Sequence, residues 1–203
     1  MRVDDLIQTD DSREELIIIS ERCSQFLRES GGIPLLKNLP SEYGDFHKVK
    51  VRKRKHRKQD PSPAFAQAFN EAFEDQWRAI RERAIFANGE ISFESADSDS
   101  LEPFYIFPSD GYQYMYSREV ENSSQDYKTA FDAIFEQFGD RSNQVITELL
   151  RFSYVSNEKL IEGIKTGAEI ILYNTPYFYA IRANTVDDYE SLFHNMTNIL
   201  EDM

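Results

Sequence analysis

Apolar residues recur at helical spacing in several stretches of the chain, so the pattern predicts a first set of helices. One helix begins at Ser12, whose hydroxyl can cap it, and ends at Gly31-Gly32. A second opens at Ser62-Pro63, and a last one is capped by Thr185. Two or three more are predicted near 125–138, 142–152 and 157–165. The apolar stripes of the first, second and last helices are Leu16, Ile19, Cys23, Phe26 and Leu27; Phe65, Phe69, Phe73 or Ala72, Trp77 and Ile80; and Val186, Tyr189, Leu192, Phe193, Met196, Ile199 and Leu200.

Between the helices, alternation and turn residues predict strands. Residues 46–55 alternate as a half-exposed strand, and 84–87 form a short buried strand that closes at the turn dipeptide Asn88-Gly89. Residues 104–107 and 112–116 flank Pro-Ser-Asp-Gly and predict a hairpin with Tyr112, Tyr114 and Tyr116 on one face. A further strand pair covers 169–173 and 177–182. Pro34 and Pro40 mark a connecting loop.

These elements predict an α+β fold in a single domain over 1–203. Residues 1–45 form an N-terminal helix and loop, 46–182 the α+β core with aromatic hairpins, and 183–203 a C-terminal helix. A chain of 203 residues that is 40% hydrophobic can bury one sizeable core. The longest aliphatic run, Leu16 to Ile19, is far too short to span a membrane, and no secretory signal is visible. We therefore expect a soluble, cytoplasmic protein.

Charge is distributed unevenly along this chain. The formal net charge is −13, which disfavours binding to nucleic acid or to an anionic membrane surface. Eight Lys or Arg and no acid lie between Lys48 and Lys58, and subtracting them leaves −21 on the rest. This basic segment has three interpretations: a solvated edge strand protected from aggregation, a nucleic-acid contact, or a clamp for an anionic cofactor. Around Glu90 to Glu102 the acids predict an exposed loop.

The chain lacks the common nucleotide, metal and hydrolase motifs. It has one cysteine and three histidines without metal-ligand spacing, so no metal site is expected. Cys23 falls on the apolar stripe of the first helix and is expected to be a buried structural thiol.

A series of short motifs carries a resemblance to a known family. Lys48-Val49-Lys50-Val51-Arg52-Lys53-Arg54 leads to Arg83-Ala84-Ile85-Phe86-Ala87-Asn88-Gly89, then to Phe104-Tyr105-Ile106-Phe107 and Met115-Tyr116-Ser117, and later to Gly167-Ala168-Glu169-Ile170-Ile171-Leu172. The order resembles small proteins of tailed bacteriophages and the three-part layout of ADP-ribosyltransferases, over about residues 46 to 182.

That resemblance implies an NAD-dependent transferase that modifies a host target. Arg52 or Arg54 would hold the NAD phosphates, Tyr112 or Tyr114 would stack on the nicotinamide, and Glu169 would be the catalytic carboxylate that stabilises the cationic ribose. The chain departs from the family at Ala87-Asn88, where Ser or Thr is usual, and at Gly167, where an acid or Gln can stand. Packing tyrosines and a solvated Glu169 at a strand entry are the alternative interpretations.

A different class of function fits the composition as well. A small, acidic protein rich in Tyr and Phe suits a non-enzymatic binder that inhibits a host protein. Presenting carboxylates in rows, as a DNA mimic does, is one way to achieve this. Glu201 and Asp202 at the end of the chain fit such a surface, whereas Lys48–Lys58 does not. The sequence leaves the acceptor, the partner and the oligomeric state open.

Overall fold

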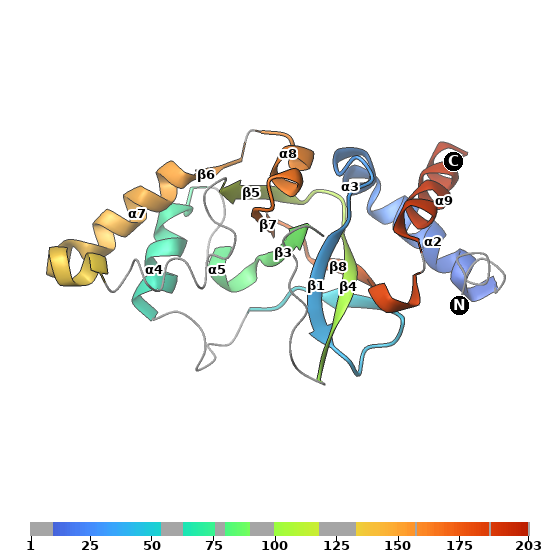
Figure 1. The fold of residues 1–203 in the computed structure, drawn as a ribbon, viewed down its shortest axis with the longest axis horizontal. Helices are drawn as coiled ribbons and strands as arrows, with labels where there is room; N and C mark the ends of the chain where they lie inside the picture. Colours follow the sequence, from blue (N-terminus) through green and yellow to red (C-terminus); the bar gives the residue numbers. More distant parts are fainter. Residues whose placement is uncertain are drawn as a thin grey trace.

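A computed structural model describes residues 10–53, 63–75, 80–89, 100–117, 133–156, 158–186 and 188–202. Helices lie mostly toward the two ends of the molecule, and the strands form one sheet between them (Figure 1). The helices are α2 (Asp10–Arg22), α3 (Ser24–Glu29), α4 (Pro63–Ala72), α5 (Ile80–Arg83), η2 (Gly139–Arg141), α7 (Ser142–Ser153), α8 (Leu160–Lys165), η3 (Ala183–Thr185) and α9 (Tyr189–Glu201). The strands are β1 (Leu35–Pro40), β2 (Phe46–Lys50), β3 (Ile85–Gly89), β4 (Leu101–Pro108), β5 (Gln113–Ser117), β6 (Tyr154–Val155), β7 (Glu169–Tyr173) and β8 (Tyr177–Arg182). The predicted α+β class and the terminal helices are confirmed.

Eight strands form a sheet in the order β2-β8-β4-β1-β3-β7-β5-β6, and every neighbouring pair is antiparallel. The predicted hairpin of β4 and β5 is wrong. These strands are consecutive in the chain, but β1, β3 and β7 lie between them in the sheet. The turn residues do reverse the chain, and Gly111 takes the left-handed φ of 87° that such a turn needs.

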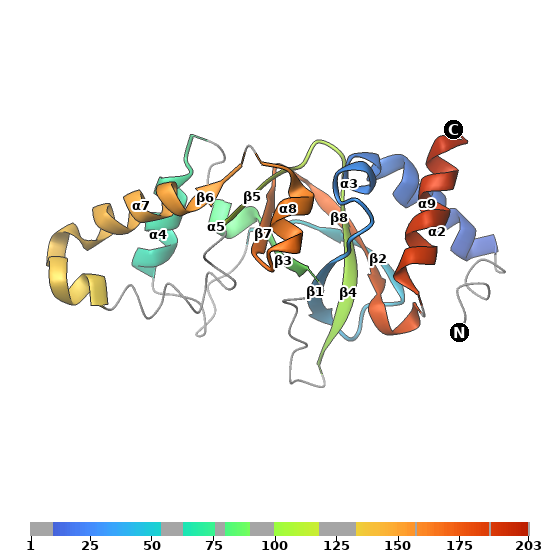
Figure 2. The ribbon, with the colours of Figure 1, turned by 45° about the horizontal axis from the view of Figure 1, so that its top comes forward.

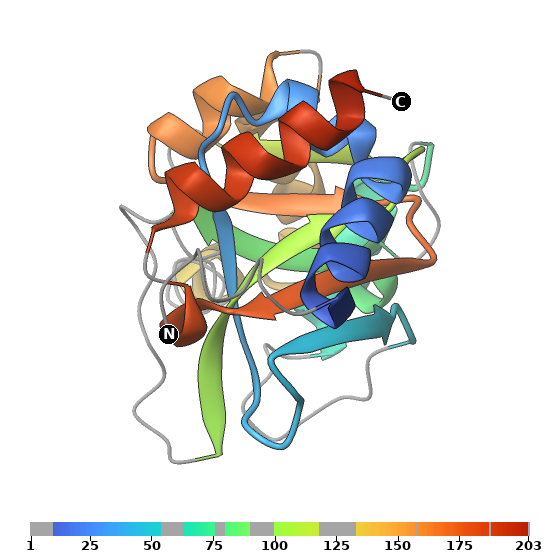
Figure 3. The same ribbon diagram turned by 90° about the vertical axis from the view of Figure 1, so that its right-hand side faces the viewer.

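The sheet is strongly curled. Residues 174–176 alone join β7 to β8, although β3, β1 and β4 lie between these strands. Four strand spacings would separate them by about 19 Å in a flat sheet, whereas four Cα steps reach about 15 Å at most. The end of β7 must therefore approach the start of β8, and the hydroxyls of Ser109 and Thr175 share a hydrogen bond of 2.8 Å at this end. In Figure 3, β1 runs nearly upright whereas β7 and β8 run across the view.

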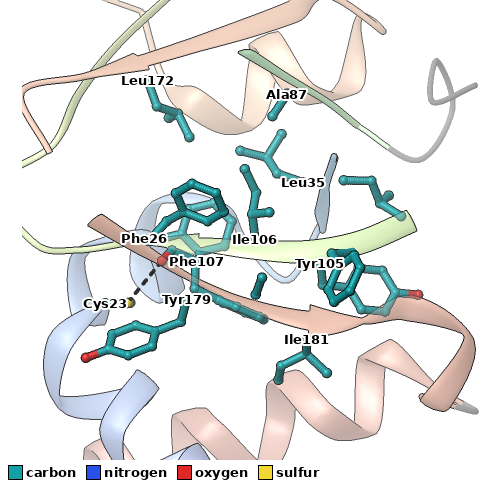
Figure 4. Close-up of a cluster of buried hydrophobic side chains, with 14 of the residues drawn as sticks. Cys23, Phe26, Leu35, Ala87, Tyr105, Ile106, Phe107, Leu172, Tyr179 and Ile181 are labelled. Carbon is teal, nitrogen blue, oxygen red and sulfur yellow. Dashed lines mark hydrogen bonds between the residues drawn. The ribbon is translucent and has the colours of Figure 1, made fainter. Parts of the chain in front are cut away.

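The first core fills the inside of this curl and continues under the terminal helices. In Figure 4, Leu35, Ala87 and Leu172 face Ile106 across the inside of the sheet. Side chains on the other face of β8 and β4, such as Tyr179 and Phe107, point toward the terminal helices, and Phe107 packs on Phe26 of α3. Tyr105 of β4 likewise packs on Tyr189 of α9. Both faces of these strands are therefore covered by protein.

The second core lies at the other end of the molecule, where α4, α5 and α7 cover one face of β3, β7 and β5 (Figure 2). Successive side chains of β7 divide between the cores: Ile170 and Leu172 join the first, Ile171 and Tyr173 the second. A strand buried on both faces carries a continuous apolar run, which is what residues 170–173 show.

The predicted first helix is interrupted at Cys23, which separates α2 from α3. Asp110 explains the interruption, because its carboxylate accepts hydrogen bonds from the Gln25 backbone N–H at 2.8 Å and the Ser24 hydroxyl at 2.9 Å. Its own N–H donates to the Arg22 carbonyl. A turn that is distant in sequence thus caps α3, and local periodicity could not have predicted this.

Four other predictions need correction. The predicted strands 169–173 and 177–182 are present as β7 and β8, but they do not pair with each other, because β3, β1 and β4 lie between them in the sheet. The segment between Pro34 and Pro40 is the central strand β1 and not a loop, because the prolines stand where a strand tolerates them, before its first residue and at its last. Asn88 and Gly89 pair with β1 inside β3 and make no turn. The cap of α9 is Asp188, which accepts from the N–H groups of residues 190 and 191, and not Thr185.

Several predictions lie partly outside the described residues, among them the helix near 125–138, of which 133–138 is described and helical. The second predicted helix ends as α4 at Ala72 and resumes as α5 at Ile80, with Trp77 in the undescribed interval. Residues 90–99 of the predicted acidic loop are likewise undescribed, and Glu102 belongs to β4.

Candidate protein-binding surface

Arg52, a predicted cofactor residue, follows β2 at the end of the sheet where β8 begins. The Val51 N–H donates to the Pro176 carbonyl at 2.9 Å, which fixes the chain there, and the Arg52 side chain is exposed. The adjacent Lys53 pairs with Glu82 of α5 at 2.9 Å. Arg54 lies outside the described residues.

Tyr112, Tyr114 and Tyr116 all pack toward the first core, which confirms that they share one face. The Tyr112 hydroxyl donates to a Glu29 carboxylate oxygen at 2.6 Å, and burial together with this bond raises the pKa of Tyr112. The Tyr114 hydroxyl donates to the Glu158 backbone oxygen at 2.8 Å. Tyr112 and Tyr116 are 2% and 0% exposed, so Tyr114 is the one with an accessible edge among these three.

Two surface hollows share Tyr114 as a wall. One, of about 430 Å³, also contains Tyr112 and Asp75, and the other, of about 450 Å³, contains Arg28, Lys159 and Glu29. Each hollow holds a carboxylate, so neither offers the purely cationic lining that a pyrophosphate prefers.

Glu169, the predicted catalytic carboxylate, is the first residue of β7 and lies opposite Asn88 of β3. It is 8% exposed, so the alternative of a solvated carboxylate is wrong. Tyr173, at the other end of β7, is the β7 residue closest in sequence to Pro176, whose carbonyl accepts the Val51 N–H. About 13 Å of strand separates the two ends. The predicted arginine, tyrosines and glutamate thus lie in three places, and the described residues do not gather them around one cleft.

A different surface stands out at the far end of the molecule. Helix α7 packs Ile146 and Leu150 into the second core against α4. Val145, Leu149 and Phe152 follow one another at the spacing i, i+4, i+7, which places them on one side of the helix, beside the buried stripe. We call these three residues the α7 apolar surface. Leu149 is 45% exposed and Phe152 is 90% exposed.

Two further aromatic residues are exposed nearby in the chain. Phe135 and Phe138 lie in the helical turn 133–138, just before η2, and are 55% and 36% exposed. The four exposed large apolar residues of the described chain therefore all fall between 135 and 152. Single exposed apolar residues are common, but a group confined to one region of the chain is a candidate for contact with another molecule.

Acidic side chains predominate around α7. Exposed carboxylates of α4, its following turn and α7 itself are Glu71, Glu74, Asp75 and Glu148. Arg151 is held by Glu148 at 3.0 Å and by the backbone oxygens of Glu71 and Ala72. The other described cation of this region, Arg141, stands before α7.

The α7 apolar surface was not identified from the sequence, although its signal is present. Helix 142–152 was predicted correctly, and its apolar residues occupy a wider arc than one packing contact needs. Which side would be buried depends on α4, a partner about 80 residues earlier in the chain, so the sequence could not separate the packed stripe from the free one.

Among the described helices, none combines the length and the hydropathy that crossing a membrane requires. No family model, no curated protein and no solved structure matches this chain.

Proposed function

We propose that this chain is an acidic binding protein that docks a basic partner protein through the α7 apolar surface. The observation that carries the proposal is the exposure of Leu149 and Phe152 on one side of a helix whose other side is packed. Burying a side chain of either type contributes about 1.5–3 kcal/mol in transfer free energy. Contact with a partner is the simplest use of such a surface.

Charge indicates the kind of partner. The chain carries −13 overall, and the carboxylates beside α7 exceed the cations there. Protein interfaces commonly combine an apolar centre with a polar rim. A partner with an apolar patch and a basic rim would match both features, whereas a second copy of this chain would bring like charges together.

This proposal develops the binding alternative that the sequence suggests, but it moves the contact. Carboxylates presented in rows, as in a DNA mimic, would make the acids the centre of the interface. In the proposed interface, carboxylates surround the α7 apolar surface, and Phe152 makes the main apolar contact.

Site-specific photo-crosslinking tests the proposal and identifies the partner. Benzoylphenylalanine at position 152 should crosslink one basic protein in extracts of the source cells, whereas the same probe at exposed position 201 should not. Equal products at both positions would contradict a partner-specific surface.

The purified partner then allows a direct comparison of affinities. Leu149→Glu and Gln144→Glu each add one negative charge to α7, but only the first changes the apolar surface. We expect Leu149→Glu to weaken binding about tenfold or more, which is about 1.4 kcal/mol, and Gln144→Glu to have little effect. Equal losses in the two variants would overturn the proposal.

NAD-dependent ADP-ribosyl transfer, the other function that the sequence suggests, stays a prediction. Calorimetry with NAD and with the Glu169→Gln variant tests it. Binding by both proteins, with hydrolysis by the wild type alone, would support a transferase. No heat at millimolar NAD would remove it.

A further inference from the structure

Within the described part of the chain, the outer edge of β2 carries backbone groups that pair with no other strand. Among the described strands, β8 is the sole neighbour of β2. The Arg182 N–H donates to the Asp45 carbonyl, and the Val51 N–H donates to the Pro176 carbonyl, which sets the phase of the ladder. In an antiparallel pair, successive residues point their backbone groups alternately toward and away from the neighbour. Residues 45, 47, 49 and 51 therefore face β8, and 46, 48 and 50 face outward.

Exposed cations accompany this open edge. Lys48 and Lys50 lie on the same face of β2, opposite Tyr179 and Tyr177 of β8, and Arg52 follows two residues later. The Lys48 ammonium lies 3.9 Å from the centre of the Tyr177 ring, a cation–π distance that holds the side chain over the sheet. The other face of the strand carries the half-buried Val49 and Val51.

We propose that the outer edge of β2 accepts an extended acidic peptide of a partner protein as an additional antiparallel strand. Residues directly opposite in an antiparallel pair share a face, so carboxylates two positions apart would stand across from Lys48 and Lys50. The intervening peptide residues would lie on the face of Val49 and are best filled by β-branched apolar side chains. This surface is separate from the α7 apolar surface.

The same charges decide against other occupants. Two copies of β2 would place lysines opposite lysines, and edge lysines are a common protection against such self-pairing. The same lysines would attract an incoming strand that carries carboxylates. A nucleic acid would satisfy the lysines but has no backbone pattern that matches the outward N–H and C=O groups of residues 46, 48 and 50.

Amide hydrogen exchange tests the proposed strand directly. The probe is a capped peptide in which Glu and Val alternate, six residues long between terminal glycines. We expect it to slow exchange at the N–H groups of Phe46, Lys48 and Lys50, whereas those of residues 47, 49 and 51 are already bonded to β8. A peptide of the same composition in which the three Glu are consecutive should protect these amides less. A peptide in which Lys replaces each Glu should not protect them. Binding of the Glu-Val peptide without protection at 46, 48 and 50 would overturn the proposal, as would protection by oligothymidylate in its place.

A matched pair of variants separates the backbone contact from the charge. Lys48→Ala and Lys48→Pro both remove the cation, but only proline removes the outward N–H, and it leaves the bonds to β8 intact. We expect Lys48→Pro to bind the Glu-Val peptide about threefold to tenfold more weakly than Lys48→Ala, the effect of one hydrogen bond. Lys50→Glu keeps the backbone donor but reverses the charge. At low salt this variant should therefore bind the Glu-Val peptide much more weakly than the wild type does. Equal binding by the alanine and proline variants would contradict strand addition.

Discussion

The two cores of this protein use their apolar residues differently. In the first, the curled sheet and the terminal helices cover both faces of β4 and β8, and Phe104 and Ile106 are 0% and 1% exposed. In the second, α7 packs one side on α4 and leaves Phe152 at 90% exposure on the other. Packing within the fold accounts for the apolar residues of the first core. At the second core, α7 carries apolar side chains that the fold leaves exposed, and these are the basis of the proposed contact with a partner.

The largest effect is expected in the first core. Ile106 lies inside the curl, among Leu35, Ala87 and Leu172 (Figure 4). Ile106→Ala should lower the free energy of unfolding by about 3–5 kcal/mol, because the surrounding strands cannot collapse into the cavity. Urea denaturation measures this loss. A loss below about 1 kcal/mol would mean that the inside of the sheet is not closely packed.

Two adjacent leucines of α7 differ in burial within one helix. Leu150 is 0% exposed and Leu149 is 45% exposed. Leu150→Ala should destabilise the protein by about 2–4 kcal/mol, whereas Leu149→Ala should change stability by no more than about 0.5 kcal/mol. Both are measured by the same denaturation experiment. Similar losses for the two variants would show that Leu149 is structural.

A smaller effect on stability is expected where α8 contacts Tyr116 of β5. A Cβ at Gly163 would lie 2.5 Å from the Tyr116 ring, which is 0% exposed and cannot move aside. Gly163→Ala should therefore cost about 1–3 kcal/mol and lower Tm by about 2–4 °C for each kcal/mol, despite the better helix propensity of alanine. Gly44→Ala is the control, because a Cβ there meets only the Phe46 carbonyl at 3.8 Å. A higher Tm for Gly163→Ala would contradict this packing.

The smallest effect concerns the reactivity of a single thiol. Cys23 is 0% exposed, as the sequence predicted, and its thiol donates to the Phe107 carbonyl at 3.4 Å. Burial and the nearby Asp110 carboxylate raise the pKa of Cys23, so the reactive thiolate is scarce at neutral pH. Ellman's reagent should label the native protein no faster than the protein unfolds. Complete labelling within seconds in native buffer would place this thiol at the surface.

Local patterns predicted most of the elements but little of their pairing. Alternation identified β2, the turn residues 174–176 marked the end of the apolar run 170–173, and helical spacing identified α4, α7 and α9, because these signals depend on neighbours in the chain. The Pro-Ser-Asp-Gly turn suggested a hairpin, yet the curl of the sheet carries β4 and β5 to different neighbours. Curl depends on the short β7–β8 connection acting with the whole sheet, which no local pattern contains.

The candidate site residues show the same division between features that local patterns predict and features that depend on distant residues. The common face of Tyr112 and Tyr114 was predictable from alternation, but the partner of Tyr112, Glu29, is more than 80 residues away. The basic segment Lys48–Lys58 was recognised from composition. Its interpretation as an edge strand agrees with the position of β2 at the edge of the sheet. Which of its backbone groups face outward required the ladder to β8.

One double variant tests whether the α7 apolar surface serves binding and not folding. For Leu149→Gln/Phe152→Gln we expect a free energy of unfolding within about 0.5 kcal/mol of the wild type, together with loss of affinity for the crosslinked partner. A fall in stability comparable to that of Leu150→Ala, or affinity equal to that of the wild type, would contradict it.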